Sequence, residues 1–153
     1  MVKPENEVKI MNAEDLYLFL KEVDMDFPVP ISKKQDLIEY SEKLFKKATL
    51  CAKYDDGKII SLVAGYTENL TDDMAYIAIV ATAKVGRGLG LAPKLVKEFI
   101  SICKAKNIVA VHLYTDKQNE VAVKMYEEIG FLPYKAENEL RPYDMHLIYY
   151  IRK

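Results

Sequence analysis

Residues 76–90 read Tyr-Ile-Ala-Ile-Val-Ala-Thr-Ala-Lys-Val-Gly-Arg-Gly-Leu-Gly, an apolar run that ends in closely spaced glycines. The apolar run is typical of a strand that is covered on both faces. Beyond the glycines, Leu95, Val96, Phe99 and Cys103 recur at helical spacing, and residues 108–114 form a short β-rich run. A strand, a crossover helix and a second strand predict a parallel pair with a right-handed connection.

The glycine segment, Gly86-Arg87-Gly88-Leu89-Gly90, is predicted to hold an anion. Glycines let the backbone turn sharply and approach a ligand closely. The free N–H groups of the first helical turn and the positive end of the helix dipole favour negative charge there. Pro93 fits this boundary, because a first-turn residue has no intrahelical acceptor for an N–H. A tight connection without a ligand is the alternative.

Two common nucleotide-binding patterns fail on this segment. The dinucleotide fingerprint Gly-x-Gly-x-x-Gly requires glycine where Leu91 or Pro93 stands. A Walker-type loop requires Lys and then Ser or Thr after its last glycine, but Gly90 is followed by Leu91 and Ala92. The anion is therefore not expected to belong to either of these nucleotide classes.

Flanking segments complete the predicted order of elements, which is α, α, β, β, β, α, β, α, β, β. Asn12 is expected to cap a first helix, and Ser32 with Gln35 to form the capping box of a second. Two β-rich runs around a turn at 55–57 predict an antiparallel hairpin, and Gly130 is expected to end a helix over 120–129. The predicted fold is mixed α+β (α/β), with helices on both faces of one mostly antiparallel sheet.

A second segment, residues 119–131, opens with Asn119-Glu120 and closes with Met-Tyr-Glu-Glu-Ile-Gly-Phe. Asn119 and Tyr126 are two helical turns apart and therefore lie on the same side of the helix. Together with the strand at Ile79-Val80 and the glycine loop, this segment resembles the GNAT superfamily of acyl-CoA-dependent N-acyltransferases. The resemblance covers about residues 76–131 and implies a splayed parallel strand pair and acetyl-CoA as cosubstrate.

The same resemblance implies site residues. Those expected to bind the cofactor are Ile79, Val80, Val85, Gly86, Arg87, Gly88, Leu89, Gly90, Asn119 and Tyr126. The family usually has Arg or Gln where Val85 stands, so a side-chain donor is missing at the loop entrance. Backbone N–H groups and the charge of Arg87 remain for binding the diphosphate.

Direct transfer to an amine requires donors aimed at the developing oxyanion and a proton for the departing thiolate. By resemblance, the N–H of Val80 is the oxyanion donor and Tyr126 the general acid. A phenol with a pKa of about 10 is protonated at neutral pH; the alternative for Tyr126 is packing alone. The general base stays open: Asp24, Asp26 and Glu68 are candidates, and each is expected to be a solvated surface charge instead. His112 and His146 receive no role.

Composition bounds the remaining properties. The chain has 153 residues, which predicts one domain over 1–153, and a formal charge of −1, which disfavours nucleic acid as a partner. Cys51 and Cys103 are expected to be reduced core thiols. The start, Met1 to Glu7, lacks the apolar stretch of a secretory signal, and no apolar run approaches the length of a membrane span. We therefore expect a cytoplasmic protein that binds neither membrane nor metal and is a monomer or homodimer.

The acceptor is expected to bind between residues 25–32 and 134–144 and to be a small-molecule primary amine, such as an amino sugar or amino acid derivative; a peptide terminus is not excluded. Two other functions stay open. One is a CoA-binding sensor or interaction module that has lost turnover, and the other is a domain that binds a different phosphate ligand.

Overall fold

The computed structural model describes residues 11–70 and 72–152. The start of the chain, from which the lack of a secretory signal is inferred, lies outside these residues. The helices are α1 (Ala13–Val23), α2 (Leu37–Lys47), α3 (Leu91–Ala105) and α4 (Glu120–Ile129), with short 3-10 turns η2 (Asp24–Asp26), η3 (Ile31–Lys33) and η4 (Lys84–Gly86). The strands are β1 (Thr49–Asp55), β2 (Lys58–Tyr66), β3 (Met74–Thr82), β4 (Ala110–Thr115), β5 (Leu132–Pro133) and β6 (Met145–Tyr150). The predicted order of helices and strands is confirmed.

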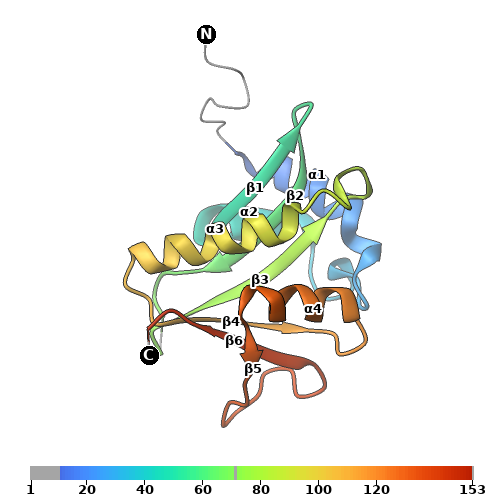
Figure 1. Ribbon diagram of the computed structural model, residues 1–153. Helices are drawn as coiled ribbons and strands as arrows, with labels where there is room; N and C mark the ends of the chain where they lie inside the picture. Colours follow the sequence, from blue (N-terminus) through green and yellow to red (C-terminus); the bar gives the residue numbers. More distant parts are fainter. Residues whose placement is uncertain (1–10, 71, 153) are drawn as a thin grey trace.

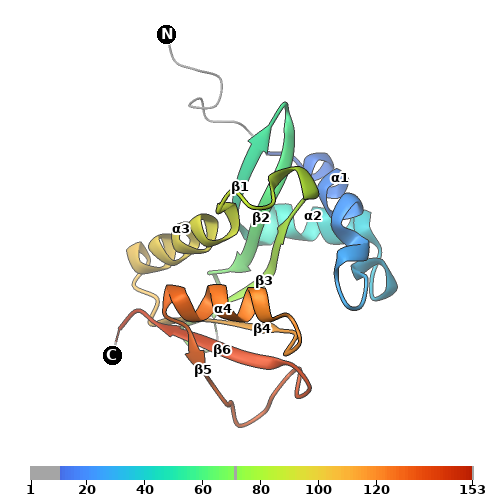
Figure 2. The ribbon, with the colours of Figure 1, turned by 45° about the vertical axis from the view of Figure 1, so that its right-hand side comes forward.

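The strands form one six-stranded sheet in the order β1-β2-β3-β4-β6-β5. Only the β3–β4 pair is parallel, and α3 makes the connection between its strands. Helices α1 and α2 cover one face of the sheet, and α3 and α4 cover the other (Figures 1 and 2). The predicted mixed sheet with helices on both faces is therefore confirmed.

Helix α1 begins where the sequence predicts, because Asn12 Oδ1 accepts the Asp15 N–H at 2.8 Å. The predicted capping box of α2 is wrong. Asp36 caps this helix, accepting N–H bonds from Ile38 and Glu39. Ser32 lies in η3 instead and donates its hydroxyl to Asp24 Oδ2 at 2.6 Å. A buried carboxylate requires hydrogen-bond donors, and this requirement explains why Ser32 turns away from the helix.

Strand β3 contains a β-bulge that reverses which side its residues face. Ala64 of β2 pairs with Ile79, but the next residue, Gly65, pairs with Ile77, so Ala78 is the extra residue. Before the bulge, Ile77 belongs to the core beneath α3 and α4; after it, Ile79 belongs to the core beneath α1 and α2. Val80 consequently packs on the α3 and α4 side.

Strands β3 and β4 pair only over a short stretch and then separate. Residues 74–77 are in register with residues 110–113, and no pairing continues past Ile77 and Leu113 (Figure 1). The prediction that β3 is covered on both faces holds in part: its residues contribute to both cores, but Tyr76, Ala78 and Val80 are only half-buried. The predicted splayed pair is present, and it opens a space within the sheet.

The two cysteines are buried and unpaired, as predicted. Burial raises the pKa of Cys51 to about 12 and that of Cys103 to about 11, so both are thiols at neutral pH. Along β6, Leu147 is buried in the core beneath α3 and α4, with Met145 and Tyr149 packed beside it. Among residues 11–70 and 72–152, no helix combines the length and the apolar character that crossing a bilayer requires.

Candidate active site

The glycine loop turns twice before α3 begins. Gly88 and Gly90 have φ of +79° and +71°, the left-handed region that favours glycine, and a Cβ at either position would meet no atom within 4 Å. The loop backbone is therefore open to solvent, as expected for a surface that receives a ligand. Val85 and Leu89, at its entrance and tip, are 72% and 66% exposed.

The predicted N–H donors of this loop are only partly free. The Gly86 N–H donates to Ala83 O at 2.9 Å and the Arg87 N–H to Lys84 O at 3.2 Å, because both complete the 3-10 turn η4. These two amides are therefore occupied, which corrects the expectation that all amides of the loop are free.

The next amides, those of Gly88, Leu89, Gly90 and Leu91, donate to no other group in the part of the chain that the structure describes. Gly90 provides no side-chain cap, so the first turn of α3 also keeps its donors. Four consecutive donors at the positive end of a helix that runs from Leu91 to Ala105 suit an anion.

Arg87 links this loop to the opposite wall of the site. Its Nε donates to Thr82 O at 3.2 Å, and its Nη2 lies 2.7 Å from Asp26 Oδ2. Both side chains are about half exposed. The guanidinium is held beside the glycine loop and adds positive charge there.

A cavity of about 990 Å³ opens where β3 and β4 separate. Among the predicted site residues, it is lined by Ile79, Val80, Arg87, Asn119 and Tyr126. Val85, Gly86, Gly88, Leu89 and Gly90 lie outside the lining and continue from it toward α3. The predicted residues thus form one continuous path from the helix N-terminus to the space between the strands.

Tyr126 lies in α4 with only 5% of its surface exposed, and its ring meets Phe131 edge-on at 5.5 Å. Burial raises its pKa above the usual value of about 10, so the phenol keeps its proton well into the basic range. Asn119 begins α4 by accepting the Ala122 N–H at 3.1 Å. Both residues line the cavity, so the side of α4 that they share faces it.

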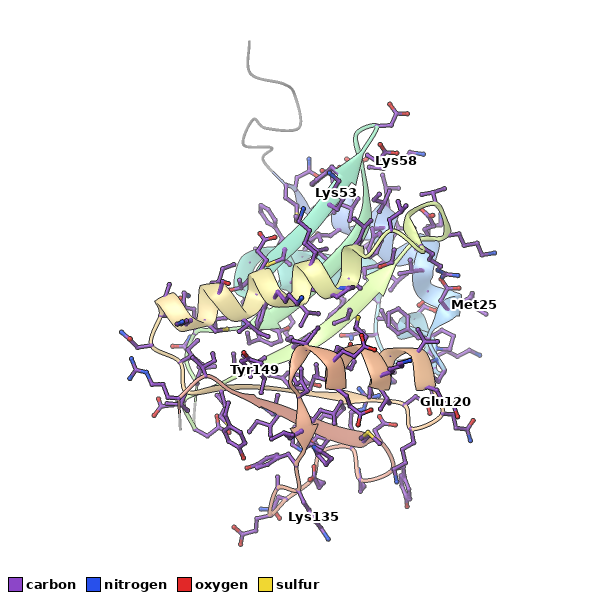
Figure 3. The ribbon with its side chains drawn as sticks, in the orientation of Figure 1. Met25, Lys53, Lys58, Glu120, Lys135 and Tyr149 are labelled. Atoms are coloured by element: carbon purple, nitrogen blue, oxygen red, sulfur yellow. The ribbon has the colours of Figure 1, made fainter. Side chains whose placement is uncertain are left out.

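The two segments predicted to hold the acceptor both reach this cavity. From the first come residues 26–29 and Ile31, and from the second come residues 140–144. Met25 projects away from the connection after α1 and is 77% exposed (Figure 3), while Tyr143 is 90% exposed. Of these two residues, Tyr143 lines the cavity, so an exposed aromatic side chain lies at its edge.

Each of the three carboxylates considered as bases is bonded to another side chain. Asp24 is bonded to Ser32, Glu68 is paired with Lys106, and only Asp26 lines the cavity, where it pairs with Arg87. No group of His, Cys, Asp or Glu suited to a metal ion occurs within residues 11–70 and 72–152.

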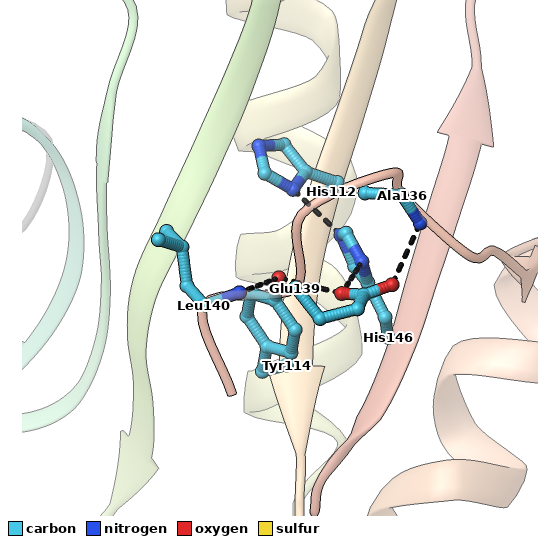
Figure 4. A network of polar contacts seen from close by, with 6 residues as sticks. All are labelled: His112, Tyr114, Ala136, Glu139, Leu140 and His146. Atoms are coloured by element: carbon cyan, nitrogen blue, oxygen red, sulfur yellow. Dashed lines mark hydrogen bonds and ion pairs between the residues drawn. The ribbon is translucent and has the colours of Figure 1, made fainter. Parts of the chain in front are cut away.

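A polar cluster that the sequence did not predict reaches the cavity through Tyr114, and its contacts are drawn in Figure 4. It joins Tyr114 and His112 of β4, His146 of β6 and Glu139 of the connecting loop. The two histidines lie in β4 and β6, whose antiparallel pairing brings them together, and the sequence did not predict that pairing. Glu139 lies in a loop, where no periodicity indicates which way a side chain points.

A sequence model of the acetyltransferase (GNAT) family matches residues 16–131. The chain belongs to the GNAT family of acetyltransferases. Against N-alpha-acetyltransferase 30 of Schizosaccharomyces pombe, this GNAT chain is 38% identical over 60 residues, 39% of its own length and 40% of the relative's. Against mycothiol acetyltransferase of Thermomonospora curvata, it is 28% identical over 97 residues, 63% of its length and 32% of the relative's.

The chain thus spans well under half the length of either of these curated relatives. Among solved structures, the GNAT fold is shared with the PaiA N-acetyltransferase of Thermoplasma acidophilum in complex with coenzyme A. The TM-score is 0.69 at 16% identity, and the match covers 90% of this chain and 92% of that one. At this identity, the likeness shows the fold.

Proposed function

We propose that residues 1–153 form a single N-acetyltransferase domain, which transfers an acetyl group from acetyl-CoA to a primary amine by direct attack in a ternary complex. The observation that carries the proposal is the cavity between β3 and β4, which is lined by Tyr126 and by Arg87 and Ala92, the residues on either side of the free amides at the α3 N-terminus. A cosubstrate with a diphosphate at one end and a thioester at the other fits this arrangement. The complex of a protein with the same fold and coenzyme A supports the choice.

In this proposal the chain holds acetyl-CoA largely through its backbone. The amides of Gly88 to Leu91 receive the diphosphate, and Arg87 contributes charge. The pantetheine arm enters where β3 has no β4 partner, alongside Ile79 and Val80. The N–H of Val80 then serves the carbonyl oxygen as it becomes an oxyanion, and one such donor is worth about 3–4 kcal/mol in a hydrolase.

Tyr126 is the proposed general acid. Attack of the amine forms the N–C bond, the C–S bond breaks, and the sulfur takes the phenol's proton. Burial favours the protonated phenol, so this acid is in the required form at neutral pH. Asn119, at the start of the same helix, is proposed to hydrogen-bond the cosubstrate while it caps α4.

For the acceptor, a small-molecule amine such as an amino sugar or amino acid derivative is the first candidate. The mixture of phenols, Asp26 and Arg141 in the lining offers both stacking surfaces and polar contacts. A peptide N-terminus is the second candidate. The exposed Tyr143 in the cavity lining favours it, because this residue extends the contact surface beyond the reacting amine. The two curated relatives, by name, include both classes.

Two measurements test the proposal. Coenzyme A at 100 times its dissociation constant should stabilise the protein by about 2.7 kcal/mol, which a thermal shift detects. Thiol release from acetyl-CoA is then followed with glucosamine, a free amino acid, a polyamine and a short peptide with a free α-amino group. Binding of coenzyme A without thiol release for any amine would favour a CoA-binding sensor. A thermal shift with another phosphate compound, and none with coenzyme A, would favour a domain that binds a different phosphate ligand.

The compartment proposed for this reaction is the cytoplasm. The buried, unpaired thiols of Cys51 and Cys103 support it, because reducing compartments keep cysteines unpaired.

A further inference from the structure

Four side chains form a hydrogen-bonded chain that begins at Tyr114 in the cavity lining and ends at His112 of β4 (Figure 4). The Tyr114 hydroxyl lies 2.8 Å from Glu139 Oε2, and the same oxygen lies 2.8 Å from His146 Nδ1. His146 Nε2 lies 2.8 Å from His112 Nδ1. The second carboxylate oxygen, Oε1, accepts the Ala136 N–H at 2.6 Å. Every polar atom of Glu139 is therefore bonded within the protein.

The positions of the hydrogens follow from the partners. An ionised carboxylate only accepts, so the Tyr114 hydroxyl and His146 Nδ1–H both donate to Glu139. Between His146 Nε2 and His112 Nδ1 one nitrogen donates and the other accepts. The Leu140 N–H donates to the Tyr114 oxygen at 3.1 Å, which leaves that oxygen one lone pair.

Of these four residues only Tyr114 lines the cavity. His146 and Glu139 have side-chain exposures of 4% and 18%, and the Tyr114 ring stacks on His146 at 4.2 Å. Tyr114 is therefore the member of the cluster that a molecule bound in the cavity can contact.

The charges around the cluster favour an ionised Glu139. Burial opposes ionisation, but the bonds from the Ala136 N–H, Tyr114 and His146 outweigh it, so the pKa of Glu139 is lowered. Burial and the bond to Glu139 raise the pKa of Tyr114, which is thus a neutral donor.

Other polar and charged groups face the cluster from neighbouring segments. From β3, Tyr76 packs on both His112 and Tyr114, and Tyr134 meets His146 edge-on. Arg141 lies over the Tyr114 ring and is paired with Asp144. Burial and the neighbouring His146 lower the pKa of His112, which keeps that imidazole neutral.

We propose that Tyr114 is a catalytic residue that removes the proton from the acceptor amine and passes its own hydroxyl proton to Glu139. This inference rests on the proposed acetyl transfer and supplies the base which that reaction needs. His146 is a positioning residue, because it fixes the carboxylate without touching the cavity.

The protons balance as follows. The acceptor enters as an ammonium and loses two protons before it becomes an amide nitrogen. One moves to the Tyr114 oxygen as the Tyr114 hydrogen moves to Glu139, and Glu139 later releases it to solvent. The second proton of the ammonium restores the Tyr126 phenol, which has given its own proton to the sulfur. The N–C bond forms, the C–S bond breaks, and one proton is released per turnover.

The test compares Glu139→Gln and Tyr114→Phe with the unchanged protein, using the best acceptor of the four-amine panel. General acid–base catalysis contributes about 10²-fold or more, so kcat is expected to fall about 100-fold in each variant. The dissociation constant of acetyl-CoA is expected to stay unchanged. The deficit of Glu139→Gln is expected to shrink as pH rises toward the pKa of the amine, because a free amine no longer needs this base.

Tyr150→Phe is the matched control, since this tyrosine lies on β6 with 46% of its surface exposed; it is expected to retain full kcat. Equal kcat in Tyr114→Phe and the unchanged protein would overturn the proposal. A deficit that is the same at every pH would also overturn it, because a purely structural role predicts that result. If the unchanged protein acetylates no amine, the proposed function itself fails; if it does and only the variants contradict expectation, this inference alone fails.

Discussion

Arg87 Nη2 lies 2.7 Å from Asp26 Oδ2, so a single ion pair joins the glycine loop to the segment that follows α1. The first partner stands beside the proposed diphosphate site and the second in the proposed acceptor site. The two halves of the ternary complex are thereby connected through one pair of charges.

Removing either partner of this ion pair should change cofactor binding in opposite directions. Arg87→Gln removes positive charge and should weaken coenzyme A binding about 10-fold, whereas Asp26→Asn frees the guanidinium and should tighten binding about 2- to 5-fold. Because both side chains are about half exposed, each change should alter the free energy of unfolding by less than about 1 kcal/mol. Calorimetric titration measures the affinities, and both effects should shrink in 1 M salt. Identical affinities in the two variants would contradict the assignment of Arg87.

Gly88→Ala should impair binding beyond its effect on stability. Gly88 and Gly57 have φ of +79° and +77°, and a Cβ at either meets no neighbouring atom. Alanine at each position should therefore cost a similar amount of stability, about 1–2 kcal/mol. Only Gly88→Ala should also weaken coenzyme A binding, because alanine disfavours the backbone conformation of residue 88, whose amide belongs to the proposed diphosphate site. Equal coenzyme A affinity in the two variants would exclude the loop as that site.

Tyr126→Phe should lower turnover about 100-fold and leave the affinity for acetyl-CoA unchanged. Because burial raises the pKa of this phenol above about 10, deprotonation of Tyr126 should not reduce the turnover of the unchanged protein at any pH below 10. Steady-state thiol release from pH 6 to 10 measures both effects. Full activity in the variant would leave Tyr126 with a packing role only.

Ser32→Ala should reduce stability at neutral pH and have little effect in acid. The Ser32 hydroxyl bond is the main cause of the lowered pKa of Asp24; burial opposes it, and the Ser32 and Ile31 N–H groups add to it. A pKa lower in the folded than in the unfolded chain, where it is about 3.9, stabilises the fold above that value. This stabilisation is lost as pH falls through the folded value.

The expected loss in Ser32→Ala is about 1 kcal/mol at pH 7, measured by urea unfolding, and it should narrow below pH 4. Ser101→Ala, on the exposed side of α3, is the control and should show no such pH dependence. A deficit of equal size at pH 7 and pH 3 would mean that the bond does not stabilise the ionised carboxylate.

Much of this fold is predictable because its signals are local. Asn12 caps α1, Gly130 ends α4, and the alternation along β6 places Leu147 inward, each as its neighbours in the sequence indicate. The capping box at Ser32 fails because Asp24, eight residues earlier, takes the serine hydroxyl. A tertiary partner outweighs a local pattern in that case.

The candidate site divides in the same way. Residues on regular elements, such as Val80, Asn119 and Tyr126, face one cavity as spacing and resemblance predict. Glu139 lies in a loop, and its partners belong to two strands that are distant in sequence. No periodicity fixes such a side chain, so the cluster becomes visible only when the sheet pairs β4 with β6.

The extra residue at Ala78 has a consequence for how this strand can vary. Because it switches the side that later residues face, Ile77 before it and Ile79 after it pack into different cores. Exchanging one apolar residue for another alters a single neighbourhood, but deleting one residue would turn every following side chain toward the wrong partner. In homologous chains, the number of residues in β3 should accordingly be conserved more strictly than the identity of its apolar residues.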